Sequence, residues 1–215
     1  MATFFEILER RWPVFLQEGL EHLQLVLASI AVATIIGVTL GVVVYRHERA
    51  ASLTLAVTGA ILTVPSFALF ALLIPLVGIG WRPAWIGLIA YALLPIVRNT
   101  VTGLRGVDAE IVESARGMGM RRRQQLARVE LPLAWPVVLT GIRVSTLLIV
   151  SIAAIAALVG GPGLGNPILA GLARIGGAGA VPLVVGGTIG VIIVALILDL
   201  FYLLLGRLTV PRGLK

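Results

Sequence analysis

The chain has 215 residues, of which 59% are hydrophobic and 13% are charged, and its mean hydropathy is +1.06. The mean hydropathy and the hydrophobic fraction both exceed those of a soluble domain and indicate a membrane protein. The absence of cysteine excludes disulfides and thiolate metal sites. The formal net charge of +7 is explained by arginines placed for membrane topology, so no nucleic-acid partner is expected.

The N-terminal residues 1–22 mix charged and apolar side chains. Glu6, Glu9 and Arg10 interleave with apolar residues at roughly helical spacing. This pattern predicts a short amphipathic helix that lies at the membrane surface. A cleavable signal would start with a basic region and continue directly into an apolar run, so none is expected here.

Five stretches approach the length of about 20 apolar residues that a helix needs to cross a bilayer. We therefore predict an all-α membrane protein with a single transmembrane domain over residues 1–215. The five spans are expected at Leu23–Tyr45, Leu53–Val77, Pro83–Val101, Leu133–Val159 and Val181–Leu205.

The distribution of Lys and Arg predicts the orientation, because cytoplasmic loops carry an excess of both. With five spans and the C-terminus inside, twelve such residues lie in the cytoplasm and four lie outside, while Arg143 falls within the fourth span. We expect the N-terminus outside and the C-terminus inside. The twelve are Arg46, Arg49, Arg98, Arg105, Arg116, Arg121, Arg122, Arg123, Arg128, Arg207, Arg212 and Lys215. The four are Arg10, Arg11, Arg82 and Arg174.

The longest polar segment, residues 102–132, is expected in the cytoplasm between the third and fourth spans. Asp108 is a plausible N-cap of a first helix, and Gly117 and Gly119 permit a turn after it. A second helix is expected over Arg121–Glu130, and Pro132 then starts the next span, where a missing N–H is tolerated.

This segment resembles the EAA signature of ABC importer permeases, which reads E-A-A, three residues, G, nine residues, I, one residue, L-P. The matching positions are Glu113, Ser114, Ala115, Gly119, Val129, Leu131 and Pro132. Only Ser114 and Val129 depart from the signature, and both replacements are similar in size. The resemblance implies a MetI-like permease whose short helix, with Met118 in its turn, docks on an ATPase.

The chain lacks the residues that bind a nucleotide phosphate. It contains no G-x-x-x-x-G-K-[ST] motif, and its only lysine is Lys215. We therefore expect a non-catalytic subunit without a cofactor or metal of its own. ATP and Mg²⁺ are expected on partner ATPase subunits.

Further runs resemble one branch of these permeases, the osmoprotectant importers for glycine betaine, carnitine and choline. The runs are Glu21–Leu23, Thr63–Ser66, Tyr91–Thr100 and Gly160–Gly165. The resemblance implies a second permease copy or paralogue, two cytoplasmic ABC ATPase subunits and an extracellular or periplasmic substrate-binding protein, assembled in a bacterial or archaeal cytoplasmic membrane.

The sequence does not decide which class of solute the chain carries, or whether it carries one with an ATPase. A quaternary ammonium is best bound by aromatic faces, and because the predicted spans hold no aromatic cluster, we expect the selective cage on the binding protein. A methionine-like amino-acid importer shares the same signature. A stand-alone channel or scaffold is the third possibility, and it would function without the coupling segment.

Several polar residues within or near the spans have two interpretations. Pro65 and Ser66 interrupt the second span and either line the solute path or form a simple kink. Asn99 could contact solute or belong to the cytoplasmic gate. Arg143 and Asp199 lie at similar depths in the last two spans, which predicts an ion pair between them.

Two other features receive structural interpretations. His22 and His47 are isolated, so each is expected to be a solvated residue at an interface. The glycine-rich run over residues 160–179 is too irregular to bind a nucleotide. We expect it to form an outer capping or re-entrant loop near the place where the binding protein docks.

Overall fold

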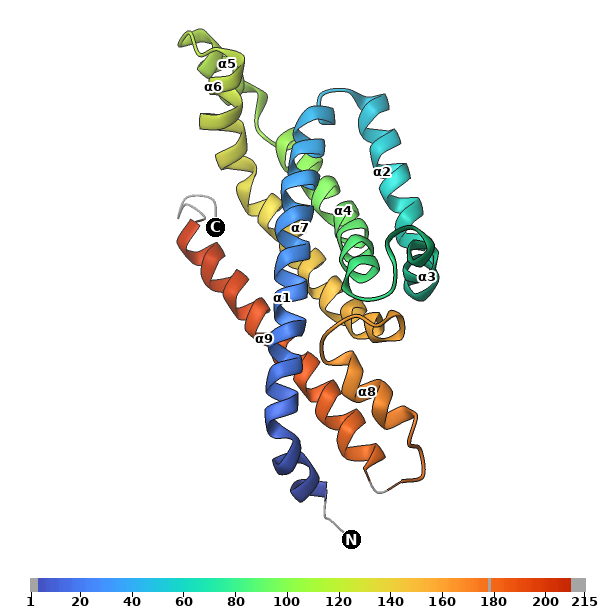
Figure 1. Ribbon diagram of the computed structural model, residues 1–215. Helices are drawn as coiled ribbons and strands as arrows, with labels where there is room; N and C mark the ends of the chain where they lie inside the picture. The colour runs from blue at the N-terminus through green and yellow to red at the C-terminus, as the bar shows by residue number, and fades with distance from the viewer. Residues whose placement is uncertain (1–3, 178, 210–215) are drawn as a thin grey trace.

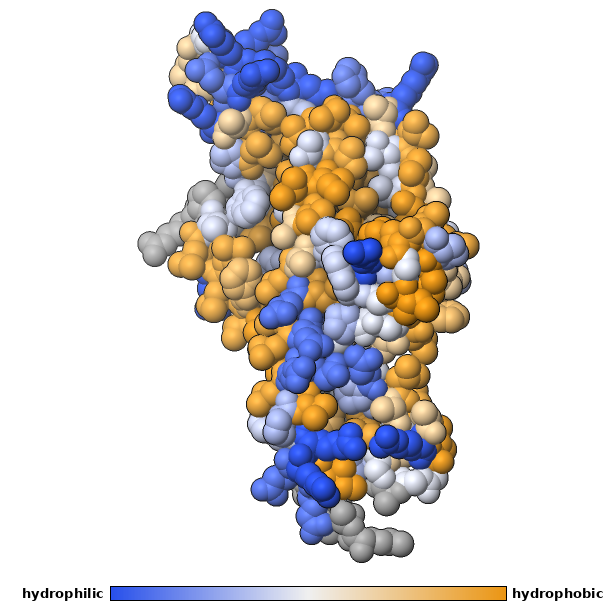
Figure 2. Space-filling view, in the orientation of Figure 1, coloured by the Kyte–Doolittle hydropathy of each residue, from blue (hydrophilic) through white to orange (hydrophobic). Residues whose placement is uncertain are grey.

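The computed structural model describes residues 4–177 and 179–209, and within these ranges every regular element is a helix. Four helices are long and apolar enough to cross a membrane, and a bent pair makes five if its halves form one span. Figure 1 shows an elongated bundle with a small helical protrusion at one end. In Figure 2, hydrophilic residues gather at both ends, and the surface between them is largely apolar over the upper half of this face. The predicted all-α membrane fold is confirmed.

The first helix, α1 (Phe4–Val44), contains 41 residues. At 1.5 Å per residue it is about 60 Å long, twice the hydrocarbon thickness of about 30 Å. The prediction of a separate surface helix over residues 1–22 is wrong for its described part, residues 4–22, which continue without a break into the first span. Tertiary packing supports this extension, because Phe15 is 9% exposed and its ring fills the space beside Gly186.

The predicted second span is bent into two helices, α2 (Glu48–Thr63) and α3 (Ser66–Val77), which meet at 97°. The predicted interruption of this span at Pro65 and Ser66 is therefore present, and it is a sharp bend between two helices. Pro65 has no N–H to continue the helix, and its ring opposes a regular turn. The Tyr91 hydroxyl donates to the Val64 carbonyl oxygen at 2.5 Å, which gives that carbonyl a partner at the bend.

The centre of the bundle is α4 (Trp81–Arg105), which packs between α1 and α7 (Leu131–Ala153). Glycines allow the close approach. A Cβ on Gly41 of α1 would lie 2.6 Å from Thr100, and a Cβ on Gly141 of α7 would lie 2.6 Å from Asn99. Small residues bring membrane helices close enough for extensive van der Waals contact.

After α7 the chain forms the 3₁₀ helix η2 (Ala154–Val159). The α-helical part of the predicted fourth span therefore ends at Ala153 and not at Val159. The glycine-rich run that follows contains a further helix, α8 (Gly165–Leu172), which packs against α9 (Ala180–Thr209). Figure 1 shows α8 and the start of α9 at the end of the molecule opposite α5.

Candidate coupling segment and solute path

The polar segment over residues 102–132 forms the protrusion in Figure 1. It contains α5 (Ala109–Gly117), α6 (Arg122–Gln125) and the π-helical turn η1 (Leu126–Glu130). The structure therefore has the helix, turn and helix that the sequence predicts. The α6 helix continues through η1 into α7 as one run of 38 residues, Arg122–Val159, so the second part of the segment is rigidly connected to a membrane helix.

Local sequence signals explain both ends of α5. The Asp108 side chain accepts a hydrogen bond from the Glu110 backbone N–H at 2.9 Å, which caps the helix start. After the helix, Gly119 adopts a φ of +80°, in the left-handed region that glycine enters without a steric penalty. The chain can therefore reverse direction immediately after α5.

The α5 helix presents a mixed surface to its surroundings. Ile111, Glu113, Ser114 and Met118 are exposed, with Met118 at 71%, whereas Ala115 is 2% exposed and faces inward. The surface combines apolar side chains with a carboxylate and a hydroxyl at the tip of the molecule. Such a surface suits docking in a protein cleft better than contact with lipid.

Pro132 lies in the first turn of α7, directly after η1, so its missing N–H interrupts the hydrogen bonding of a continuous helical run. Leu131 is half-buried and packs against the core. The π-helical turn directly before these two residues is the kind of irregularity that occurs at functional sites within helices.

A carboxylate that sequence analysis did not single out lies at the root of this segment. Glu130 is 2% exposed, and its Oε1 accepts from Arg122 Nη1 at 2.8 Å and from Arg46 Nη2 at 3.1 Å. The Tyr45 hydroxyl donates to Glu130 Oε2. A buried carboxylate is stable only with such partners, so this cluster fixes the geometry of η1 against the end of α1.

The same cluster reaches α4, because Arg105 Nε donates to the Tyr45 carbonyl oxygen at 2.6 Å. The guanidinium carbons of Arg46 and Arg122 lie 5.3 Å and 5.9 Å from the centre of the Tyr45 ring. We call Tyr45, Arg46, Arg105, Arg122 and Glu130 the Glu130 cluster. In the sequence, its arginines indicate membrane topology alone. An acidic residue directly before an apolar span, on the side where arginines gather, is the sequence signal for this cluster.

The three residues considered for the solute path do not come together. Pro65 is exposed at the bend, and Ser66 is the half-buried first residue of α3. Asn99 lies about two helical turns along α4 from Tyr91, which contacts the bend. Its Nδ2 donates to the Pro95 carbonyl oxygen at 2.8 Å, so this amide is used within α4.

Arg143 and Asp199 do come together, on α7 and α9. Arg143 Nε donates to Asp199 Oδ1 at 2.7 Å, and its Nη2 donates to Oδ2 at 2.8 Å. This two-pronged geometry is the strongest form of a guanidinium–carboxylate pair. A hydrogen bond from Thr146 Oγ1 to the Tyr202 hydroxyl, at 2.9 Å, joins the same two helices.

His22 is not a solvated residue, which corrects the interpretation from the sequence. It is 0% exposed, and its Nε2 N–H donates to the Val150 carbonyl oxygen of α7 at 3.0 Å. The reason is the length of α1, which carries His22 into the interior of the bundle instead of ending there. His47 is exposed at the N-cap position of α2.

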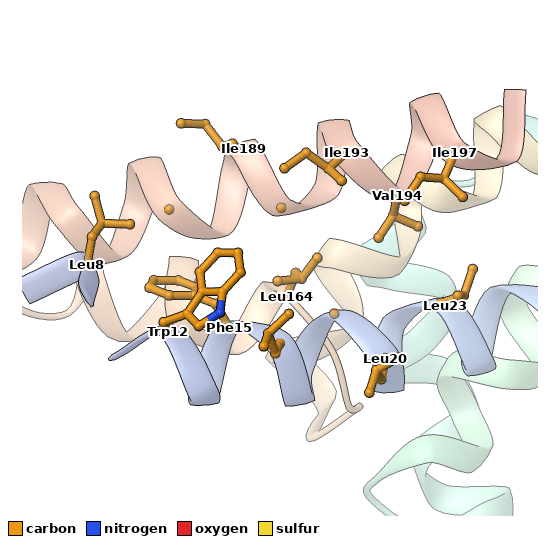
Figure 3. Close-up of a pocket in the computed structure, with 14 residues that line it drawn as sticks. Leu8, Trp12, Phe15, Leu20, Leu23, Leu164, Ile189, Ile193, Val194 and Ile197 are labelled. Carbon is orange, nitrogen blue, oxygen red and sulfur yellow. The ribbon is translucent and has the colours of Figure 1, made fainter. Parts of the chain in front are cut away.

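An apolar groove of about 250 Å³ lies between α1 and α9. Figure 3 shows Trp12 and Phe15 of α1 on one side of it and Ile189 and Ile193 of α9 on the other. No charged side chain lines the groove, so it offers no partner to a charged solute. Its chemistry suits hydrocarbon chains.

A bundle of membrane-crossing helices with a short protruding helix at one end is the architecture of a transporter membrane subunit. The chain belongs to the family described as binding-protein-dependent transport system inner membrane component, whose model matches residues 33–210. It is a permease subunit of an ATP-binding-cassette importer of the MetI-like type.

Curated relatives match almost the whole chain. The choline transport system permease protein OpuBB of Bacillus subtilis is 36% identical, over 100% of this chain and 97% of its own length. The glycine betaine/carnitine/choline transport system permease protein OpuCB of the same organism is 37% identical, over 91% and 88%. The osmoprotectant import permease protein OsmW of Salmonella typhimurium is 38% identical, over 91% of both chains.

Solved structures share the fold at lower identity. An inward-facing structure of the MetNI methionine ABC transporter matches with a TM-score of 0.80 and 22% identity, over 94% of this chain and 99% of that chain. An amino acid ABC transporter with histidines matches with a TM-score of 0.76 and 15% identity, over 96% and 99%. At these identities the likeness supports the fold.

Proposed function

We propose that this permease imports quaternary ammonium osmoprotectants such as glycine betaine, choline or carnitine. The observation that carries the proposal is the set of relatives that are 36–38% identical over at least nine-tenths of this chain. Their names specify choline, glycine betaine/carnitine/choline and osmoprotectant import, respectively. The amino-acid transporters share the fold at 22% identity or less. They therefore give less support to a methionine-like solute.

The proposed assembly contains two permease chains, identical or paralogous, two cytoplasmic ATPase subunits that hold ATP and Mg²⁺, and an external binding protein. The exposed face of α5 supports docking of the ATPase at this end. A cavity of about 430 Å³ beside α6 is lined by Arg46, Arg116 and Arg122, and this charge suits acidic residues on the partner.

The proposed orientation in a bacterial or archaeal cytoplasmic membrane places α5 inside and the start of α1 outside. The arginine distribution supports it. Of the residues counted toward the inner side, Arg212 and Lys215 lie outside the described residues. In the cycle, ATP binding draws the coupling segments together, and the spans alternate between outward and inward access.

The test is uptake of labelled glycine betaine, choline, carnitine and methionine into cells that carry this chain with its ATPase and binding protein. The wild type is compared with the double variant Glu113→Ala, Gly119→Pro, and membrane levels are measured by immunoblot. We expect quaternary amines to enter the wild-type cells and uptake to fall at least tenfold in the variant at equal membrane level.

Two results would contradict the proposal in different ways. Uptake of methionine alone would overturn the solute assignment while leaving the permease role intact. Normal uptake by the double variant would instead favour a channel or scaffold that works without the coupling segment.

A further inference from the structure

A cavity of about 350 Å³ lies between α1 and the start of α4, at the end of α4 that is remote from the coupling segment. Its lining includes Glu21, Gln24, Trp81, Trp85 and Pro162. No aromatic cluster was expected within the predicted spans, but α4 begins at Trp81, before the predicted third span, and it brings Trp81 and Trp85 together. The tryptophans are one helical turn apart, which puts them on the same side of α4.

The two indole rings have their centroids 6.0 Å apart and are tilted by 55° to each other. A methylated ammonium has no N–H to donate, and it is held by the negative faces of aromatic rings within about 6 Å. The Arg82 guanidinium carbon already lies 6.0 Å from the Trp81 ring centroid, so a methylated ammonium would contact the remaining ring faces of Trp81 and Trp85. Tryptophan is the side chain that gives the strongest interaction of this kind.

A carboxylate on the opposite helix complements the rings. Glu21 is half-buried, and its Oε1 accepts a hydrogen bond from Gln17 Nε2 at 3.0 Å. Among the salt bridges of the described residues, none involves Glu21. By contrast, Glu18 lies one turn earlier, and its Oε2 accepts hydrogen bonds from the Gly163 N–H at 3.1 Å and from Asn166 Nδ2 at 3.0 Å.

The indole nitrogen of Trp85 is a second sign of an incomplete site. It is buried and has no hydrogen-bond acceptor within the part of the chain that the structure describes. A buried donor without a partner is costly, and such groups are commonly satisfied by water or a ligand.

Three further cavities among the described residues do not offer the same combination. One is lined by Arg10, Arg11 and Arg174, which repel a cation. Another holds Glu18 but also Arg11, and the groove between α1 and α9 has no charged lining.

We propose that the cavity lined by Glu21, Trp81 and Trp85 binds the methylated ammonium group of the solute as it enters the permease. This inference rests on the proposed function, because it assigns a site to the solute class named there. In the proposed orientation the cavity lies toward the outer side, where a binding protein would release solute. The permease itself then contributes to selectivity.

The experiment measures binding of labelled choline and labelled glycine betaine to the permease–ATPase complex without binding protein. The complex is held in nanodiscs of phosphatidylethanolamine and phosphatidylglycerol, which supply no choline headgroup. We expect Trp81→Leu and Trp85→Leu each to weaken choline binding about five- to tenfold, with partial recovery in the Phe variants. Glu21→Gln should weaken binding of cationic choline more than binding of zwitterionic glycine betaine.

Matched controls are Trp12→Leu and Glu9→Gln, which change the same residue types away from the cavity and should bind choline like the wild type. Unchanged choline binding in the Trp81, Trp85 and Glu21 variants would overturn the site. Loss of choline binding when the complex is held in nanodiscs that contain phosphatidylcholine would show that a lipid headgroup occupies the cavity. This result would overturn the solute assignment. If wild-type cells import no quaternary amine, the proposed function fails instead.

Discussion

At the scale of single residues, Glu130 joins the end of α1 to the coupling segment through Arg46, Arg122 and the Tyr45 hydroxyl. Glu130→Gln keeps the side-chain volume but removes the negative charge that both guanidinium groups share. We expect the free energy of unfolding to fall by about 2 kcal/mol. Thermal unfolding of the purified protein measures the change, and ATP-driven uptake should fall with it because the segment is held less firmly.

The matched control is Glu110→Gln, an exposed carboxylate on the same segment. Its melting temperature should stay near that of the wild type. Equal melting temperatures for the Glu130 and Glu110 variants would show that the buried carboxylate adds nothing to the fold.

Two neighbouring glycines provide a second residue-scale prediction. Gly119 has a φ of +80°, whereas Gly117 does not have a positive φ, and neither would place a Cβ within 4 Å of another atom. Gly119→Ala should therefore destabilise the turn by about 1 kcal/mol through backbone strain alone. Gly117→Ala, which lies at the end of α5, should be neutral or slightly stabilising.

Uptake by cells that carry each glycine variant at equal membrane level is the measurement. A larger loss for Gly117→Ala than for Gly119→Ala would contradict the assignment of the turn to Gly119.

At the scale of elements, the pair between Arg143 and Asp199 connects α7 with α9. Asp199→Asn leaves the guanidinium without its counter-charge within a membrane helix, so this variant should unfold at a lower temperature than the wild type. The double variant Arg143→Leu, Asp199→Leu removes both charges, and it should recover most of the stability. Thermal unfolding in detergent separates these cases, and a double variant as unstable as Asp199→Asn would contradict a purely structural pair.

The long helices were predictable because a bilayer leaves a backbone few alternatives to a helix. The apolar runs therefore located α4, α7 and α9 to within a few residues, apart from the 3₁₀ end of α7. The bend at Pro65 could be predicted only in part from the sequence, because the Tyr91 hydroxyl donates to the Val64 carbonyl oxygen from 27 positions away. The continuity of α1 also depended on distant packing, here against Gly186 of α9.

The coupling segment and its surroundings were likewise predictable only where their contacts are local in the sequence. The cap at Asp108 and the turn at Gly119 are local, so the sequence predicts them. The contact between Arg46 and Glu130 spans 84 positions, so the acidic residue before an apolar span is a general signal that does not identify its partner. The tryptophan cavity was missed because its carboxylate comes from α1 and its rings come from α4.

At the scale of the whole molecule, the orientation can be tested directly because the chain contains no cysteine. Ala109 at the start of α5 and Ala173 after α8 are both exposed and lie at opposite ends. With Ala173→Cys, an impermeant maleimide should label intact cells. With Ala109→Cys, labelling should require permeabilised cells, and the reverse pattern would contradict the proposed topology.

We propose that the α5 segment couples a partner's ATP hydrolysis to solute movement through this chain. The most direct measurement is ATP-dependent uptake of labelled choline into proteoliposomes that contain the permease, its ATPase and its binding protein, with ATP hydrolysis recorded in parallel. We predict uptake only when ATP is enclosed on the α5 side. The Glu113→Ala, Gly119→Pro variant should lose both uptake and solute-stimulated hydrolysis while still binding choline. Uptake that persists without ATP, or in this variant at the wild-type rate, would contradict the claim.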